Sequence, residues 1–132
     1  MKTTLGLQTG NIILYSGLVH RIQTVGYWLH TDITSEEIPL DRCEPVMITE
    51  DWLLRFGFTG DESNISIALP NGFGSELCCE FLKDWCIVRY HICDGIVNRM
   101  EYDYSYIKPL KYVHELQNLF YFLCGEELCL KP

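Results

Sequence analysis

The sequence predicts an α+β fold, on the basis of three patterns along the chain. The first third alternates apolar and polar residues between tight-turn dipeptides, as antiparallel strands do. The centre repeats this pattern in four further segments, whereas the C-terminal part repeats apolar residues at helical spacing. We therefore expect a curled antiparallel β-sheet, made of an N-terminal hairpin and a central meander, with one short helix and one long C-terminal helix packed on it.

The N-terminal segment predicts a β-hairpin followed by a third strand. Ser16-Gly17 is a dipeptide suited to a tight turn, and Gly26 interrupts the apolar alternation that follows. Within the second strand, alternation places His20 and Ile22 on the same face. The three predicted strands are 11–15, 18–25 and 27–31.

The next part of the chain predicts a surface loop and then a short helix. Residues 32–45 contain several acids, two prolines and few apolar residues, which is typical of a loop. Thr49 is a suitable N-cap for a helix with acids in its first turn, and Gly57 can end it after Phe56. The expected buried stripe of this helix is Trp52, Leu53 and Phe56.

The central segment predicts an antiparallel meander, with strands at 64–69, 76–82, 85–93 and 96–104. Asp94-Gly95 tolerates the positive φ angles of a two-residue hairpin turn. Such a turn would place Tyr90 opposite Arg99 on one face of the sheet.

The C-terminal segment predicts an amphipathic helix over about 110–124. Pro109 is near its start and Gly125 lies just past its end. Residues 128–130 are expected to add a short closing strand. The apolar stripe of the helix consists of Val113, Leu116, Phe120 and Leu123.

The same C-terminal segment reads YVHELQNLFYF at 112–122, followed by GEEL at 125–128. It resembles the ending of a large group of small proteins from gut anaerobes, often encoded in prophages and other mobile elements, whose helix reads roughly YVHQLQNLYFALTGEEL. The segments 45–58, PVMITEDWLLRFGF, and 9–22 are similar to other parts of that group. The resemblance implies a phage or mobile-element origin, and no established activity accompanies it.

Length and charge bound the possible partners. With 132 residues, the chain is expected to form a single domain. Its 18 acidic and 10 basic residues give a formal charge of -8, which argues against binding to duplex nucleic acid or to an anionic membrane.

Residues 1–8 lack the features of a signal peptide, and no apolar run is long enough to span a bilayer. A cytoplasmic location in a bacterial host is the resulting expectation.

The cysteines and histidines do not predict a metal site. The seven cysteines are odd in number and include no CxxC pair, and the four histidines are dispersed. Buried free thiols in a reducing compartment are therefore expected, with no metal and no cofactor.

The candidate ligand-binding residues are His114, Gln117, Asn118, Tyr90 and Arg99. The first three share a face of the final helix, where they could bind a ligand, orient the helix against the sheet, cap neighbouring loops or face water. Tyr90 belongs to a surplus of aromatic residues, which suits either a recognition surface or ordinary strand propensity.

No catalytic residue is predicted, because the sequence has no GxSxG, HExxH, GxGxxG or phosphate-loop motif. The favoured function is a non-catalytic binding protein of a phage or mobile element. Its partner would be a host protein, such as a defence protein that it inhibits, or a small nucleotide-like signal that it sequesters. A small enzyme and a structural or replication accessory of a phage are the alternatives.

Overall fold

The computed structural model describes residues 7–26, 28–34, 36–61, 64–70, 76–82, 85–92 and 103–131. The chain divides into two compact units, each built from two chain segments. The N-terminal unit comprises Met1–Met47 and Tyr112–Leu123, and the central unit comprises Ile48–Lys111 and Cys124–Pro132. The expectation of a single domain stays a prediction.

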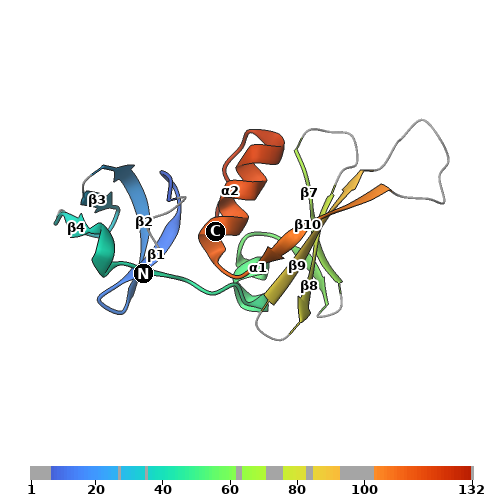
Figure 1. The fold of residues 1–132 in the computed structure, drawn as a ribbon, viewed down its shortest axis with the longest axis horizontal. Coiled ribbons are helices and arrows are strands. Elements are labelled where there is room, and N and C mark those ends of the chain that lie inside the picture. Colours follow the sequence, from blue (N-terminus) through green and yellow to red (C-terminus); the bar gives the residue numbers. More distant parts are fainter. Residues whose placement is uncertain are drawn as a thin grey trace. The chain divides into compact units, whose positions relative to one another are not determined.

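The N-terminal unit contains a five-stranded antiparallel sheet in the order β4-β3-β2-β1-β5 (Figure 1). The predicted hairpin and third strand are present in it. Ser16 and Gly17 both have positive φ, 53° and 76°, as a tight two-residue turn requires. Its strands are β1 (Ile12–Tyr15), β2 (Leu18–Val25), β3 (Trp28–Thr31), β4 (Ile38–Pro39) and β5 (Glu44–Pro45).

The interpretation of residues 32–45 as a surface loop is wrong in part. This segment supplies both edge strands of the sheet, β4 and β5, with a short 3₁₀ helix, η1 (Leu40–Arg42), between them. Ile38 and Cys43 from this segment are buried in the core, beside Ile13, Ile22 and Leu29. Strands of two residues are too short to produce an apolar alternation, so the sequence pattern did not reveal them.

The central unit contains the second five-stranded antiparallel sheet, in the order β10-β9-β8-β7-β6 (Figure 1). Its buried face includes Ile65, Leu77, Cys79 and Val88, which come from three successive strands. The strands are β6 (Thr59–Asp61), β7 (Asn64–Ala68), β8 (Glu76–Leu82), β9 (Trp85–Ile92) and β10 (Asp103–Leu110).

The short helix α1 (Glu50–Arg55) begins and ends as predicted. The Thr49 side chain accepts a hydrogen bond from the Trp52 backbone N–H at 3.3 Å, and Gly57 has a φ of 102° beyond the last turn. The predicted strand at 128–130 is absent. The Lys131 backbone N–H instead donates to the Arg55 carbonyl at 2.8 Å, which pairs a carbonyl that the helix end leaves without an internal partner.

The predicted register between the last two strands of the meander is wrong. Tyr90 pairs with Ser105 rather than with Arg99, and the strand that pairs with β9 includes 103–110. Residues 93–102, with the predicted Asp94-Gly95 turn, lie outside the described residues. Apolar and polar residues are mixed on both faces of these strands, so alternation alone specified the register weakly. Pro109 belongs to β10, where it is tolerated because β10 is an edge strand.

The C-terminal helix α2 (Val113–Cys124) starts after Pro109, a few residues later than predicted. Its residues Val113, Leu116 and Phe120 are buried, in agreement with the predicted stripe. The predicted α+β class, with antiparallel strands, one short helix and one long C-terminal helix, is thus confirmed, with the strands divided between two sheets. Neither helix is both long enough and apolar enough to cross a membrane, among the residues described.

Candidate recognition surface

Gln117 on α2 is buried and bonds to the backbone at the start of β1. Its Oε1 accepts from the Ile12 N–H at 2.9 Å, and its Nε2 donates to the Gly10 carbonyl at 2.9 Å. Both ends of the amide are therefore occupied by main-chain groups of the same unit. Among the roles that the sequence left open for Gln117, the structure shows that of orienting the helix: its two hydrogen bonds connect α2 to the start of β1.

Asn118 has a similar role at the same place. Its Oδ1 accepts a hydrogen bond from the Asn11 side-chain amide at 2.9 Å. Asn11 is itself buried, and its Oδ1 accepts from the Gln8 backbone N–H at 2.7 Å. The structure thus brings Gln117 and Asn118 together around the turn before β1.

His114 lies on the same helix and is buried, with its ring stacked on Tyr112 at a centroid distance of 6.0 Å. Its Nδ1 has no hydrogen-bond partner in the part of the chain that the structure describes. Burial lowers the pKa of His114 below its ordinary value, and the neighbouring Glu115 carboxylate offsets part of this effect. A neutral, buried imidazole is suited to packing within the fold.

Of the other two predicted site residues, one belongs to the central unit and one lies outside the described residues. Tyr90 lies on β9 of the central unit, where its backbone pairs with Leu77 and Ser105. Arg99 lies outside the described residues.

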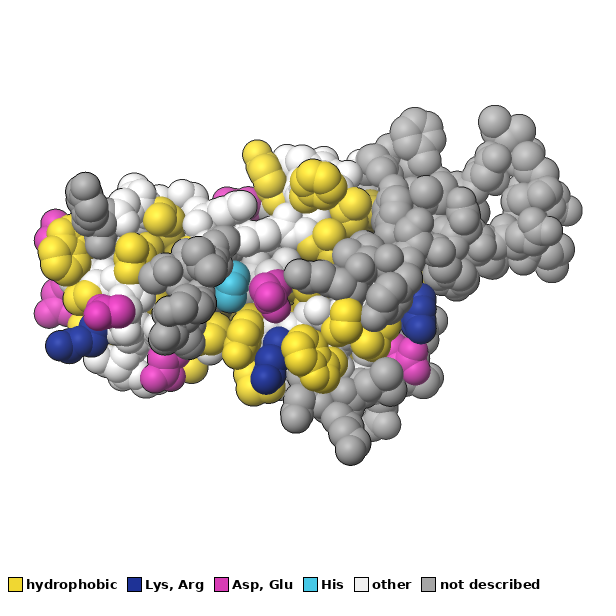
Figure 2. Space-filling model, viewed as in Figure 1, with side chains coloured by type: hydrophobic (Ala, Val, Ile, Leu, Met, Phe, Trp, Pro, Cys, Tyr) yellow, Lys and Arg dark blue, Asp and Glu magenta, His cyan; other side chains and the backbone are white. Residues whose placement is uncertain are grey.

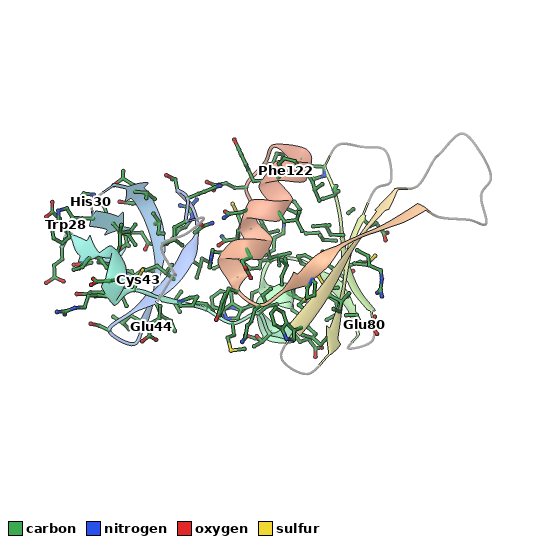
Figure 3. The ribbon with its side chains drawn as sticks, in the orientation of Figure 1. Trp28, His30, Cys43, Glu44, Glu80 and Phe122 are labelled. Carbon is green, nitrogen blue, oxygen red and sulfur yellow. The ribbon has the colours of Figure 1, made fainter. Side chains whose placement is uncertain are left out.

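The outer face of β3 carries a different set of polar and aromatic side chains. Trp28 and His30 alternate with the buried residues Leu29 and Thr31, so both project from the same side of the sheet (Figure 3). The Trp28 side chain is 46% exposed, although large aromatic side chains are usually mostly buried. The apolar alternation at 28–31 was the sequence signal that could have identified this face.

His30 links the neighbouring strands on this face. Its Nδ1 lies 2.7 Å from the Thr24 Oγ1 on β2, and its Nε2 lies 3.7 Å from the Glu37 carboxylate just before β4. The side chains of His30 and Glu37 are 45% and 58% exposed. Thr24, Trp28, His30 and Glu37 together form what we call the Trp28 surface.

Further acidic residues lie in the chain segment that connects two strands of the Trp28 surface, β3 and β4. Asp32 and Glu36 are exposed in the segment between β3 and β4, as is Glu37. The N-terminal unit as a whole has six acidic residues and three basic ones in its sequence. Figure 2 shows acidic side chains (magenta) beside hydrophobic ones (yellow) on the visible face of this unit.

A pocket of about 170 Å³ lies elsewhere on the N-terminal unit, near the β1–β2 turn. Its lining contains no aromatic side chain that could stack on a nucleobase. The lining residues are Leu14, Ser16, Gly17, Arg42 and Glu44.

The described cysteines are free thiols. Cys43, Cys78, Cys79 and Cys86 are buried, as predicted for thiols that pack as small hydrophobes. Cys124 is half-buried and Cys129 is exposed, so the expectation of burial is wrong for these two. Burial raises the pKa of Cys78 to about 11, and the Glu76 carboxylate contributes to this increase. Within the described ranges, no group of three or more His, Cys, Asp or Glu side chains could hold a metal ion.

Comparisons of the chain with protein-family models, curated proteins and solved structures find no match.

Proposed function

We propose that this protein is a non-catalytic binding protein, and that its N-terminal unit recognises a partner protein through the Trp28 surface. The observation that carries the proposal is the exposure of Trp28 on the face that also holds the hydrogen-bonded pair Thr24 and His30 and the Glu37 carboxylate. Tryptophan is enriched among the residues that contribute most to protein interfaces, because it buries a large apolar area at low entropic cost.

The shape of this surface favours a protein partner over a nucleotide-like ligand. Trp28 lies on the face of a strand, and an open face presents a ring to a broad partner. Small ligands are instead bound in concave sites that cover most of their surface. The pocket near the β1–β2 turn is concave, but its lining offers no aromatic stacking.

The resemblance to proteins of prophages and mobile elements supplies a biological setting for the proposal. In a bacterial host, a small acidic binding protein of a mobile element could act by blocking a host defence protein. The charge of -8 would steer it towards a basic partner.

The proposal is tested by affinity capture from a lysate of a gut anaerobe, with three forms of the chain: unchanged, Trp28→Ser and Trp85→Ser. Trp85 is the matched control, because it is also 46% exposed but lies on β9. Mass spectrometry identifies the captured proteins and small molecules. Each candidate partner is then purified and its affinity is measured directly.

We expect a protein that binds the unchanged chain and Trp85→Ser with equal affinity and binds Trp28→Ser at least ten-fold more weakly, as for an interface hot spot. Equal affinity for all three forms would contradict the Trp28 surface as the site. A captured small molecule whose mass changes on incubation with the protein would contradict a non-catalytic role.

A further inference from the structure

The three tryptophans of the chain differ in what covers their rings. The Arg55 guanidinium carbon lies 4.3 Å from the ring centroid of Trp52, and the Lys111 ammonium nitrogen lies 5.4 Å from that of Trp85. Both distances are within the range of a cation–π contact. Among the described residues, no basic side chain of this chain lies over the ring of Trp28, which is as exposed as Trp85.

We propose that the Trp28 ring receives a lysine or arginine side chain from the partner protein, with Glu37 as the neighbouring carboxylate. This inference rests on the proposed function and names the chemistry of the partner. A cation over the indole face is attracted by the ring quadrupole, and a carboxylate beside the ring adds a Coulombic attraction.

Strand register places Glu37 on the same face of the sheet as the Trp28 ring. Trp28 pairs with Pro39 and Leu29 with Ile38, so continuation of the same antiparallel pairing puts Glu37 opposite His30. The contact of 3.7 Å between the His30 Nε2 and Glu37 agrees with this position. Trp28 and Glu37 are thus diagonal neighbours on one face, a separation that a long basic side chain can bridge.

The existing contact of Glu37 leaves its carboxylate available to a partner. The Glu37 side chain is 58% exposed, and exposed charged contacts of this kind contribute little to stability. The His30 ring is held from its other side by Thr24 at 2.7 Å. An incoming guanidinium or ammonium group can therefore pair with Glu37 without disturbing the hydrogen bond between β2 and β3.

The charge of the surroundings selects a basic segment over an acidic one. Asp32, Glu36 and Glu37 are all exposed within one short connection, and the unit has twice as many acidic as basic residues. An acidic partner segment would be repelled here, and a basic one would be attracted most strongly at low ionic strength.

The test uses a tetra-arginine peptide with blocked ends as the probe and a tetra-glutamate peptide as its control. The indole N–H signals of the three tryptophans are followed by NMR, and each is assigned by its loss in a Trp→Phe variant. We expect the tetra-arginine peptide to shift the Trp28 signal saturably and to leave the Trp52 and Trp85 signals in place. The tetra-glutamate peptide should shift none of them.

Two variants connect the shift to the proposed contacts. Glu37→Gln should weaken binding of the peptide about two- to five-fold and reduce its dependence on salt. Glu44→Gln removes the same charge on β5, at the opposite edge of the sheet, and should change the affinity less than two-fold. Trp28→Phe has no Trp28 indole signal, so binding of the peptide to this variant is followed by the backbone amide signals of β3. The peptide should bind this variant more weakly than the unchanged protein.

The inference is overturned if the tetra-arginine peptide leaves the Trp28 signal unchanged, or if Glu37→Gln and Glu44→Gln weaken binding equally. The proposed function fails separately. A captured protein that depends on Trp28, together with no binding of the basic peptide, would retain the function and refute a cationic contact. Specific binding of the basic peptide at Trp28, with no Trp28-dependent protein in the lysate, would retain the cationic site and refute the partner-binding role.

Discussion

His114 shows how a single buried residue links the fold to pH. Its imidazole is buried on α2, with Nδ1 unpaired among the described residues, so a proton there would lack an acceptor. Burial accordingly lowers its pKa in the folded state, with a partial offset from Glu115. As the pH falls below about 6.5, the unfolded chain binds this proton more readily than the folded chain, and stability decreases.

We therefore expect the free energy of unfolding to fall more steeply between pH 7.5 and pH 5.5 in the unchanged protein than in His114→Leu. The difference in slope should be no larger than about 1.4 kcal/mol per pH unit, the limit for one proton. Urea titrations of both forms at several pH values measure it. Parallel pH profiles would show that His114 is protonated equally in the folded and unfolded states.

Gln117 is the residue that most directly joins α2 to the N-terminal sheet. Gln117→Leu has a similar size but removes the bonds to Gly10 and Ile12, which leaves a buried N–H and a buried carbonyl unpaired. We expect a loss of about 1–3 kcal/mol in the free energy of unfolding. Gln117→Glu retains the acceptor and loses the donor, so it separates the two bonds.

Tyr121 provides the control for Gln117, because it is exposed on the same helix. Tyr121→Ser should change the free energy of unfolding by no more than about 0.5 kcal/mol. A cost of similar size for Gln117→Leu would mean that the two hydrogen bonds do not stabilise the fold.

At the scale of elements, α1 depends on its caps because it is only six residues long. The Thr49 hydroxyl accepts from the Trp52 N–H, and Thr49→Ala removes this bond without altering the core. We expect a loss of about 1 kcal/mol, whereas Thr49→Ser, which retains the hydroxyl, should be close to neutral. Thermal denaturation followed by circular dichroism distinguishes the two, and equal losses would exclude the cap as the cause.

The strand β10 shows why the sequence pattern did not predict one element with its correct bounds. Its residues include Pro109, which normally argues against a central strand and suited the start of a helix just as well. Only the pairing with β9 shows that β10 is an edge strand, where the missing N–H of proline is not needed. The same pairing places Ser105 opposite Tyr90, where the sequence had predicted Arg99.

At the scale of the whole molecule, neither compact unit is a continuous stretch of chain. The N-terminal unit takes α2 from beyond the strands of the central unit, and the central unit takes its last segment from beyond α2. Unfolding residues 48–111 alone would leave a long closed loop between Met47 and Tyr112, which bridge to each other. Closing such a loop costs about 3–4 kcal/mol of entropy.

We therefore expect the two units to unfold in one transition, in agreement with the single domain that the length predicts. Trp28 fluorescence reports the N-terminal unit and Trp85 fluorescence the central unit, in two variants that carry Trp52→Phe and retain only one of the other two tryptophans. Their urea midpoints should coincide with each other and with that of far-UV circular dichroism. Two separate midpoints would show that the units are independent domains.

Three segments of the chain, 9–22, 45–58 and 112–128, meet in structural contacts. Gln117 and Asn118 from the C-terminal segment bond to residues 10–12 and to Asn11 in the opening segment. The Val113 N–H donates to the Val46 carbonyl at 2.7 Å, which joins the C-terminal and middle segments. These contacts give the three segments a role in stabilising the N-terminal unit, and the Trp28 residue lies outside them.

Local chemistry in the sequence determined the helices, the first hairpin and most of the strands. The Thr49 cap, the Ser16-Gly17 turn, the Gly57 stop and the apolar spacing of α2 each depend on residues within one or two turns of one another. Such interactions can be predicted from the sequence because the residues that make them are neighbours both in sequence and in space.

Only the tertiary structure decided which polar residues serve the fold and which remain available to a partner. Gln117 and Trp28 are both typical of binding sites in a sequence, but Gln117 meets main-chain groups more than a hundred residues away, whereas Trp28 stays exposed. The short strands β4 and β5, the register of β10 and the division into two sheets also depend on such distant pairings. A contact between distant segments produces no periodic pattern of apolar residues in either segment. The sequence alone therefore did not predict these strands, this register or the two sheets.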